Sequence, residues 1–196
     1  TLEGKVDALF KEIWSEDRED QVAWRGDGRY VARLVGSHHR EAVAQQADGE
    51  TQKPLSFRSE ASYLITGGMG GLGLLVANWM VSKGAKHLVL LGRRSPDDAA
   101  IKKITELEMA GASVVVEKAD VSDGESMRGM WQRIEESNRP LAGVIHSAGM
   151  LSDGVLQNQS WSSFERVMAP KVHGAWHLHQ LSLNQSLDFF VLFSSA

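Results

Sequence analysis

The chain has 196 residues and a slightly acidic balance, with 21 Lys and Arg against 25 Asp and Glu and a formal net charge of −4. That balance argues against a nucleic-acid surface, and the absence of cysteine excludes disulfides and thiolate metal sites and fits a reducing cytoplasm. No stretch approaches the roughly 20 consecutive apolar residues of a membrane helix, so we expect a soluble, cytoplasmic protein with no membrane partner.

The first 60 residues differ in pattern from the rest of the chain. Residues 1–20 are acidic and compatible with a helix, and residues 21–35 form two short alternating runs around Asp27-Gly28, which predicts a β-hairpin. Residues 38–54 are polar and show no periodicity, which indicates a linker or loop. We therefore expect residues 1–60 to form a small appendage with a linker, followed by one larger domain over residues 61–196.

In the larger domain, predicted strands alternate with predicted helices. The strands are apolar runs rich in Val, Leu and Ile, such as residues 114–116 and 189–193, and such runs are typical of parallel strands covered by helices on both faces. The pattern predicts an α/β fold, a doubly wound parallel sheet of Rossmann type. The predicted strands are residues 62–66, 87–91, 113–118, 143–146 and 188–193, and the predicted helices are residues 71–83, 96–110, 123–137 and 162–183.

Residues with special backbone roles mark the helix ends. Gly84 and Gly111 follow helices where a C-terminal cap belongs, and Ser95-Pro96 and Ser122-Asp123 are expected to open the next helices.

The most informative stretch joins the first predicted strand to the first helix of this domain. The spacing Gly-x-Gly-x-x-Gly is a dinucleotide fingerprint, in which glycine permits the tight turn, the close approach of backbone to phosphate, and the packing of helix on strand. The helix that follows would direct its N–H groups and the positive end of its dipole at the pyrophosphate. We expect the whole stretch to bind the cofactor: Thr66, Gly67, Gly68, Met69, Gly70, Gly71, Leu72 and Gly73.

Two arginines end the second predicted strand, in the sequence Arg93-Arg94-Ser95. NAD-binding proteins usually place an Asp or Glu about 20 residues past the glycines, to hold the ribose 2′-hydroxyl. Guanidinium groups at that place favour a 2′-phosphate, through charge-assisted hydrogen bonds. We therefore expect NADPH rather than NADH as the cofactor, the alternative being a solvated arginine pair at a strand end.

Further polar residues follow the later strands, at the edge where open α/β sheets bind their ligands. We expect the carboxylate of Asp120 to contact the adenine amino group, with Val121 beside the ring. Lys171 in the last long helix and Ser195 after the last strand are expected to converge near the nicotinamide. The fourth strand ends in a further expected cofactor segment, His146-Ser147-Ala148-Gly149.

Taken together, these motifs resemble the ketoreductase domains of modular polyketide synthases, in the short-chain dehydrogenase/reductase superfamily. The resemblance runs from Ser62 to Ala196 and is carried by T-G-G-M-G-G-L-G, G-R-R-S, A-D-V-S-D, V-I-H-S-A-G-M-L-S-D, A-P-K-V-H-G and F-S-S. It implies that residues 1–60 are the end of a structural, non-catalytic subdomain plus a linker. It also implies that residues 61–196 are an NADP-binding catalytic subdomain that is incomplete at its C-terminus.

The resemblance implies reduction of a β-ketoacyl thioester to a β-hydroxyacyl thioester by NADPH. The substrate would be carried on the phosphopantetheine arm of an acyl carrier protein, among neighbouring synthase domains. Lys171 would be the catalytic lysine and Ser195 the catalytic serine, which hydrogen-bonds the substrate carbonyl while a tyrosine supplies the proton. The only tyrosines are Tyr30 and Tyr63, both before the glycine-rich loop. We therefore expect this chain on its own to be inactive, either as a truncated piece or as a fragment made without activity.

The residues Leu151-Ser152-Asp153 match the Leu-Asp-Asp position that marks B-type ketoreductases, with Ser in the middle place. Asp153 is the more diagnostic residue, so we expect the D-configured β-hydroxy product. Two alternatives remain, a non-catalytic module that binds NADP or scaffolds its neighbours, and a free-standing short-chain dehydrogenase of another substrate class. No metal is expected, because His173 and His177 have a zinc-like spacing but no third ligand.

Overall fold

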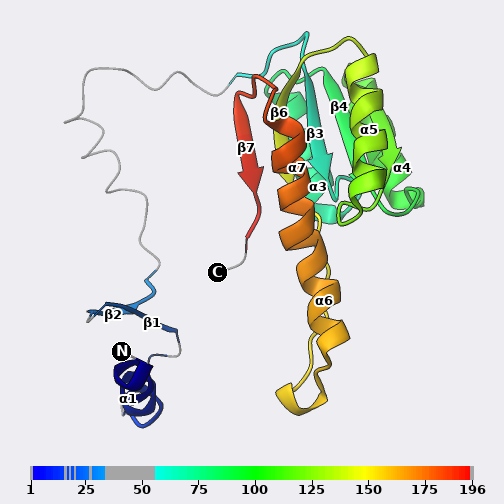
Figure 1. Cartoon of the computed structure of the whole chain (residues 1–196). Coiled ribbons are helices and arrows are strands. Elements are labelled where there is room, and N and C mark those ends of the chain that lie inside the picture. Colours follow the sequence, from blue (N-terminus) through cyan, green and yellow to red (C-terminus); the bar gives the residue numbers. More distant parts are fainter. Residues whose placement is uncertain are drawn as a thin grey trace, which may run out of the picture. The chain divides into compact units, whose positions relative to one another are not determined.

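The computed structural model describes residues 2–15, 17, 19, 21–26, 28–33 and 56–194. The chain divides into two compact units, Thr1–Lys53 and Pro54–Ala196 (Figure 1). The predicted linker over residues 38–54 lies outside the described residues.

The first unit contains a helix and a hairpin, as the sequence pattern predicts. Helix α1 spans Leu2–Ile13, and strands β1 (Val22–Arg25) and β2 (Gly28–Val31) pair antiparallel. Gly26 has a φ of 60°, a left-handed conformation that glycine adopts at little steric cost. Arg29 joins the hairpin to the helix segment through ion pairs with Glu12 at 2.6 Å and Asp17 at 2.5 Å.

The second unit is built on a five-stranded parallel sheet with the order β5-β4-β3-β6-β7. The strands pair in parallel throughout, which confirms the doubly wound sheet. The chain first moves outward from β3 to β5 and then returns to the other side of β3, so a topological switch point lies between β3 and β6. The strands are β3 (Ser62–Thr66), β4 (His87–Gly92), β5 (Ser113–Lys118), β6 (Leu141–His146) and β7 (Phe189–Leu192).

Helices cover both faces of this sheet (Figure 1). Helices α3 (Gly71–Ser82) and α4 (Asp98–Met109) pack together on one face, and α5 (Gly124–Glu136) and α7 (Ala175–Ser182) pack together on the other. Helix α6 (Trp161–Ala169), which follows a short 3-10 turn at Leu156–Asn158, projects beyond the carboxyl ends of the strands (Figure 1).

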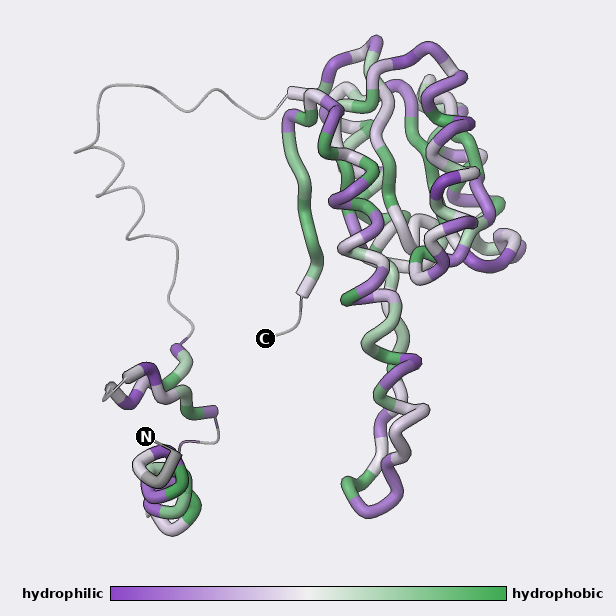
Figure 2. The backbone as a smooth tube through the Cα atoms, viewed as in Figure 1, coloured by the Kyte–Doolittle hydropathy of each residue, from purple (hydrophilic) through white to green (hydrophobic). Residues whose placement is uncertain are grey.

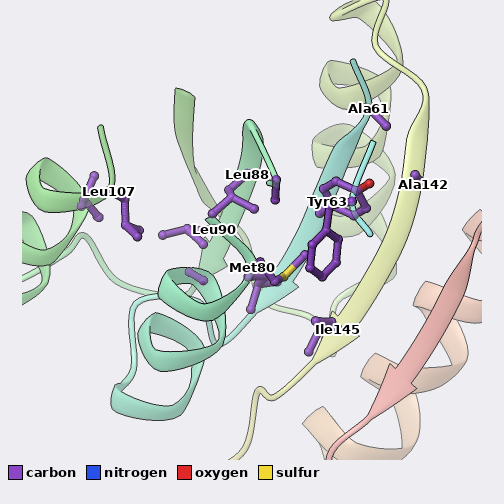
Figure 3. Close-up of a cluster of buried hydrophobic side chains, with 13 residues drawn as sticks. Ala61, Tyr63, Met80, Leu88, Leu90, Leu107, Ala142 and Ile145 are labelled. Carbon is purple, nitrogen blue, oxygen red and sulfur yellow. The ribbon is translucent and has the colours of Figure 1, made fainter. Parts of the chain in front are cut away.

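Each face of the sheet has its own hydrophobic core, because successive side chains of a strand point to opposite faces. Tyr63 of β3 packs with Met80 of α3 in one cluster (Figure 3), which also contains Ile65. Leu64 packs with Met130 of α5 in the other cluster. Figure 2 shows hydrophobic colour along the central strands. The central strands therefore form a rigid base from which the loops at the carboxyl edge extend.

The edge strands differ from the sequence prediction that every strand is covered on both faces. Strands β3 and β6 are buried along their whole length, but Val115 of β5 is 48% exposed and Val191 of β7 is 40% exposed. The expectation was therefore right for the central strands and wrong for β5 and β7. The helices lie mainly over the middle of the sheet, and each edge strand has one strand neighbour among the described residues.

The helix caps also differ in part from the prediction. Gly84 and Gly111 have φ values of 102° and 87°, which confirms them as C-terminal caps. The N-caps are Asp97 and Asp123, not Ser95 and Ser122, because these carboxylates accept hydrogen bonds from first-turn N–H groups and also stabilise the helix dipole.

The predicted helix over residues 162–183 is interrupted by a π-helical turn at Pro170–Gly174, called the π-turn below. Proline has no N–H to donate, and its ring crowds the preceding turn of an α-helix. A π-helical turn is wider than an α-helical one and is found mostly as a single turn within an α-helix. The sequence prediction of one regular helix was therefore wrong at this point.

Candidate active site

A pocket of about 400 Å³ lies at the carboxyl edge of the sheet, where the loops after four strands meet. The loops after β3, β4, β5 and β6 all contribute to it, as expected for a ligand site at the switch point of an open sheet. Its lining residues are Gly67, Met69, Gly70, Leu91, Gly92, Arg93, Arg94, Ser95, Pro96, Asp97, Ala119, Val121, Ser147, Ala148, Gly149 and Pro170.

The glycine-rich loop is shaped by positions that have no room for a side chain. Gly67 has a φ of 65°, and a Cβ there would lie 2.8 Å from the carbonyl oxygen of Ser147. A Cβ at Gly68 would lie 2.7 Å from the carbonyl oxygen of Ile65, and a Cβ at Gly73 would collide with the carbonyl of Gly67. Glycine is therefore required by close backbone contacts at positions 67, 68 and 73.

The N-terminus of α3 has the features of an anion-binding site. No side chain caps this helix, because its N-cap is Gly70, and the first N–H groups of a helix have no partner within the helix. The loop before it is held by hydrogen bonds from Gly68 N to Leu91 O at 3.1 Å and from Gly70 N to Gly67 O at 2.9 Å. This glycine cradle fits the pyrophosphate of a dinucleotide, which needs N–H donors and close backbone approach.

Arg93, Arg94 and Ser95 line the pocket at the end of β4 and are exposed. In the part of the chain that the structure describes, neither guanidinium forms a salt bridge with a carboxylate. The strand itself ends at Gly92, over which the side chain of Met69 folds so closely that a Cβ at Gly92 would collide with it. Two exposed guanidinium groups without a salt bridge at this position match a phosphate dianion.

Two carboxylates lie close to these arginines but are already engaged. Asp97 lines the pocket, and its Oδ1 accepts the Ala100 N–H at 2.9 Å. Asp120 does not line the pocket, and its Oδ1 accepts hydrogen bonds from the N and Oγ of Ser122 at 2.9 and 2.5 Å. Burial alone would raise the pKa of Asp120, but the Ser122 hydrogen bonds and the charge of Arg93 together bring it below its ordinary value.

The segment after β6 forms a wall of the pocket beside the glycine-rich loop. Ser147 donates from its N and its Oγ to the carbonyl of Thr66 at 3.1 and 2.7 Å, and Ala148 N donates to Thr66 Oγ1 at 3.3 Å. These bonds fasten the end of β6 to the end of β3 across the switch point. Ser147, Ala148 and Gly149 all line the pocket.

His146 lies behind this wall rather than in it. It is 4% exposed and does not line the pocket. Its Nδ1 lies 2.6 Å from Thr66 Oγ1 and its Nε2 lies 2.9 Å from the carbonyl oxygen of Pro170. Burial lowers the pKa of His146, against the opposing effect of the Pro170 carbonyl.

The proposed catalytic lysine lies at the rim of the pocket. Lys171 is the second residue of the π-turn and is exposed, and its Cε would lie 4.0 Å from a Cβ at Gly149. Ser195 lies outside the described residues, but Phe193 N donates to His146 O at 2.9 Å, so the chain follows β6 to the carboxyl edge two residues earlier.

Asp153 lies in an exposed loop between β6 and α6. The side-chain amide of Gln159 holds this loop, because its Nε2 donates to the carbonyls of Ser152 and Gly154 at 3.2 Å each. Both carbonyls flank Asp153, so a single side chain fixes the backbone on either side of it.

The structure thus separates the predicted cofactor residues into two groups. Ten of them line the pocket, namely Gly67, Met69, Gly70, Arg93, Arg94, Ser95, Val121, Ser147, Ala148 and Gly149. Thr66, Gly68, Gly71, Leu72, Gly73, Asp120, His146 and Lys171 surround or support it. Sequence reasoning missed the lining residues Leu91, Gly92, Pro96, Asp97, Ala119 and Pro170, for which adjacency to the motifs was the available signal.

Two further observations concern the described part of the chain. It contains no group of three or more His, Asp and Glu side chains arranged to hold a metal ion. Among these same residues, none of the helices is both long and apolar enough to cross a membrane. His177, which the sequence singled out for its spacing, instead pairs its Nδ1 with the carbonyl of Val121 at 3.0 Å.

Comparison with known proteins finds polyketide synthases among the relatives of this chain. Residues 61–196 match the family described as KR domain. A 6-methylsalicylic acid synthase of Arthrobotrys oligospora is 44% identical over 187 residues, which cover 90% of this chain and 10% of that protein. A phenolphthiocerol/phthiocerol polyketide synthase protein of Mycobacterium tuberculosis is 34% identical over 195 residues, which cover 99% of this chain and 9% of that protein. The chain spans about a tenth of the length of these relatives.

Solved structures agree with the sequence relatives. A ketoreductase domain from the bacillaene assembly line has a TM-score of 0.76 and 30% identity, covering 100% of this chain and 43% of that one. A structure of A-type ketoreductases from a modular polyketide synthase has a TM-score of 0.72 and 33% identity, covering 95% of this chain and 38% of that one. With the switch-point pocket, these likenesses establish that the chain belongs to the ketoreductase domains of polyketide synthases, in the short-chain dehydrogenase/reductase superfamily.

Proposed function

We propose that this chain binds NADPH and takes part in reducing a β-ketoacyl thioester to a β-hydroxyacyl thioester. The observation that carries the proposal is a single pocket in which the glycine-rich loop, the Arg93–Arg94 pair and the Ser147–Gly149 wall meet. These parts match what a dinucleotide phosphate needs, namely an anion site at a helix N-terminus, cations for the terminal phosphate, and a wall along the switch point.

The choice of NADPH over NADH rests on the charges at the end of β4. Arg93 and Arg94 are exposed and form no salt bridge with a carboxylate among the described residues, so a 2′-phosphate can pair with both. A free ribose 2′-hydroxyl is usually held by a carboxylate at the end of this strand, and here two guanidinium groups stand in that place.

The reduction divides between the cofactor and the chain. A bound nicotinamide supplies the hydride. The residues of the chain polarise the ketone oxygen and provide for its protonation. We assign Ser195 a hydrogen bond to that oxygen, and Lys171 the positive charge that lowers the pKa of the proton donor. The position of Lys171 beside Gly149, at the rim of the pocket, supports its assignment.

The proton donor itself is not Tyr63. The hydroxyl of Tyr63 accepts the Arg58 N–H at 2.6 Å, near the amino end of β3 and away from the carboxyl edge. Tyr63 is 1% exposed, and burial raises its pKa, which is opposite to the shift that a general acid in this role needs. Tyr30, the other tyrosine, also precedes the glycine-rich loop, so the proposal assigns the proton donor to a tyrosine outside these 196 residues.

The substrate and partners follow from the proteins that the chain resembles. The relative from Mycobacterium tuberculosis is named as part of a polyketide synthase, and the bacillaene ketoreductase belongs to an assembly line. We therefore assign the substrate to a β-ketoacyl chain on the phosphopantetheine arm of an acyl carrier protein, with neighbouring synthase domains as further partners. Asp153 assigns the reaction to the B-type, which gives the D-configured alcohol.

The test begins with cofactor binding to this chain and continues with turnover by the full-length natural protein. NADPH should bind with a much lower Kd than NADH, as measured by the change in its fluorescence. With a β-ketoacyl N-acetylcysteamine thioester, absorbance at 340 nm should fall, and Ser195→Ala and Lys171→Ala should each abolish most of the rate. Tight binding of NADPH without any turnover would instead support a non-catalytic module, and equal affinity for NADH would refute the assignment of the arginines.

A further inference from the structure

A buried hydrogen-bonded chain connects the glycine-rich loop to the π-turn that carries Lys171. It runs from Thr66 Oγ1 to His146 Nδ1 at 2.6 Å, and from His146 Nε2 to the carbonyl of Pro170 at 2.9 Å. We propose that His146 is a positioning residue. It fixes Lys171 by holding the Pro170 carbonyl, and through Thr66 it links the position of Lys171 to that of the cofactor loop. This inference rests on the proposed function.

The hydrogen-bond partners determine the tautomer of His146. A carbonyl oxygen only accepts, so Nε2 must carry the proton that is shared with Pro170. Nδ1 is then the acceptor in the neutral ring, and the Thr66 hydroxyl donates to it. Thr66 Oγ1 in turn accepts the Ala148 N–H at 3.3 Å. Every member of the chain is therefore satisfied and has a defined direction, which makes a buried network specific to one arrangement.

A carbonyl of the π-turn also accepts a hydrogen bond from a side chain. Inside a regular α-helix each carbonyl accepts from the N–H four residues later. In a π-helical turn the N–H partner lies five residues later. A carbonyl oxygen has two lone pairs, so the Pro170 carbonyl can also accept from the His146 ring. The imidazole thus holds the helix at the residue directly before Lys171.

The π-turn also packs on His146 with no room to spare. A Cβ at Gly174, the last residue of the turn, would lie 3.4 Å from His146 Cε1 and 2.9 Å from Val121 Cγ2. The side chain of Lys171 meanwhile passes Gly149, three residues after His146 on the same segment. The segment that begins at His146 therefore contacts the turn before, at and after Lys171.

A direct role for His146 in binding the cofactor does not fit this arrangement. The ring is 4% exposed and does not line the pocket, and both nitrogens already have protein partners. The sequence hypothesis that His146 contacts the cofactor is thus replaced by a role exerted through Lys171 and Thr66.

Two amide variants separate the two hydrogen bonds. The amide nitrogen of His146→Gln can take the place of Nε2 and donate to Pro170, whereas the amide oxygen of His146→Asn can take the place of Nδ1 and accept from Thr66. In the full-length protein, His146→Asn should lower kcat about 10- to 100-fold, as expected for a displaced catalytic group, and His146→Gln should lower it by less than about threefold. NADPH affinity and KM should change little in either variant. His173→Asn, an exposed histidine on the same turn, is the matched control and should leave kcat unchanged.

A second readout does not depend on activity. In this chain, the lysine amines can be dimethylated with carbon-13 and the Lys171 signal assigned by its loss in Lys171→Arg. That signal should shift in His146→Asn and stay in place in His146→Gln. If the full-length protein turns over no ketone at all, the proposed function fails, while this spectrum still decides whether His146 positions Lys171.

The wild-type chain provides a check that needs no variant to fold. Long-range proton–nitrogen spectra should show His146 protonated on Nε2 and unprotonated on Nδ1. The opposite tautomer, an unmoved Lys171 signal in a folded His146→Asn, or equal loss of kcat in the Gln and Asn variants would each overturn the proposal.

Discussion

The backbone of Gly67 lies against that of Ser147 so closely that a Cβ at position 67 would come within 2.8 Å of the Ser147 carbonyl oxygen. This contact joins the loops after β3 and β6 across the switch point of the sheet. The pocket therefore depends on a tight fit between two backbone segments that are 80 residues apart in sequence, as the Thr66–His146 pair also shows.

The first prediction concerns that contact. Gly67→Ala should weaken NADPH binding and lower the free energy of unfolding, because position 67 has a φ of 65° as well as no space for a methyl group. The left-handed conformation alone should cost about 1–2 kcal/mol. Urea unfolding and NADPH titration measure the two effects. Gly71→Ala is the control, since a Cβ there meets no atom within 4 Å, and its free energy of unfolding should be close to that of the wild type.

The second prediction concerns the cofactor phosphate. Hydrogen bonds to charged groups contribute about 1.5–3 kcal/mol, so Arg93→Ala and Arg94→Ala should each weaken NADPH binding by about 10- to 100-fold. NADH binding should change far less, and the NADPH affinity of the wild type should fall as salt is added. Arg139→Ala is a matched control, because Arg139 lies beside His87 at the amino ends of the strands. An equal loss of NADH and NADPH affinity would contradict the assignment.

The third prediction is a dependence of stability on pH. Burial holds the pKa of His146 below its ordinary value of 6.5, so the unfolded chain binds a proton at a higher pH than the folded chain. The contribution of His146 to stability is therefore complete above pH 6.5 and is lost as the pH falls below that value towards the folded pKa. Urea midpoints measured from pH 8 to pH 5 should fall accordingly.

The variant His146→Gln serves as the control for this slope, because it keeps a donor for Pro170 but does not titrate. His87 has a lowered pKa as well, from burial and from the charge of Arg139, so His87→Asn should remove a separate part of the slope. If the double variant His146→Gln/His87→Asn keeps the full wild-type dependence of stability on pH, the two histidines are not its source.

Much of the fold follows from local patterns. The apolar runs of the central strands, the glycine caps at Gly84 and Gly111, and the hairpin around Gly26 all depend on residues close in sequence. The exposure of β5 and β7 and the π-turn at Pro170 do not, because they are decided by which elements lie next to each strand or helix. Tertiary contacts of this kind leave no periodic pattern in the sequence.

The candidate site divides in the same way. The glycine-rich loop and the arginine pair can be identified from motif spacing, and the structure brings them into one pocket. Other features depend on side-chain directions, which motif spacing does not give. Met69 packs over Gly92, and Asp97 and Asp120 accept hydrogen bonds within their own loops. The limit of prediction from motif spacing is clearest at His146. Its position in the motif suggests contact with the cofactor, but its ring is hydrogen-bonded to the carbonyl of Pro170.

The last prediction concerns product stereochemistry. Gln159 Nε2 donates to the carbonyls of Ser152 and Gly154, so it holds the loop on both sides of Asp153. If Asp153 directs the ketone to one face, a loop that is no longer fixed should present both faces. Gln159→Leu removes the donor at similar size, and it should reduce the excess of the D-alcohol while lowering kcat less than Lys171→Ala does. Chiral chromatography of the β-hydroxyacyl product from the full-length protein measures this excess.

Gln159→Asn retains an amide on a shorter side chain and should recover part of the selectivity. A wild-type product with the L configuration would exclude the B-type assignment, and an unchanged excess in Gln159→Leu would show that the loop needs no anchor.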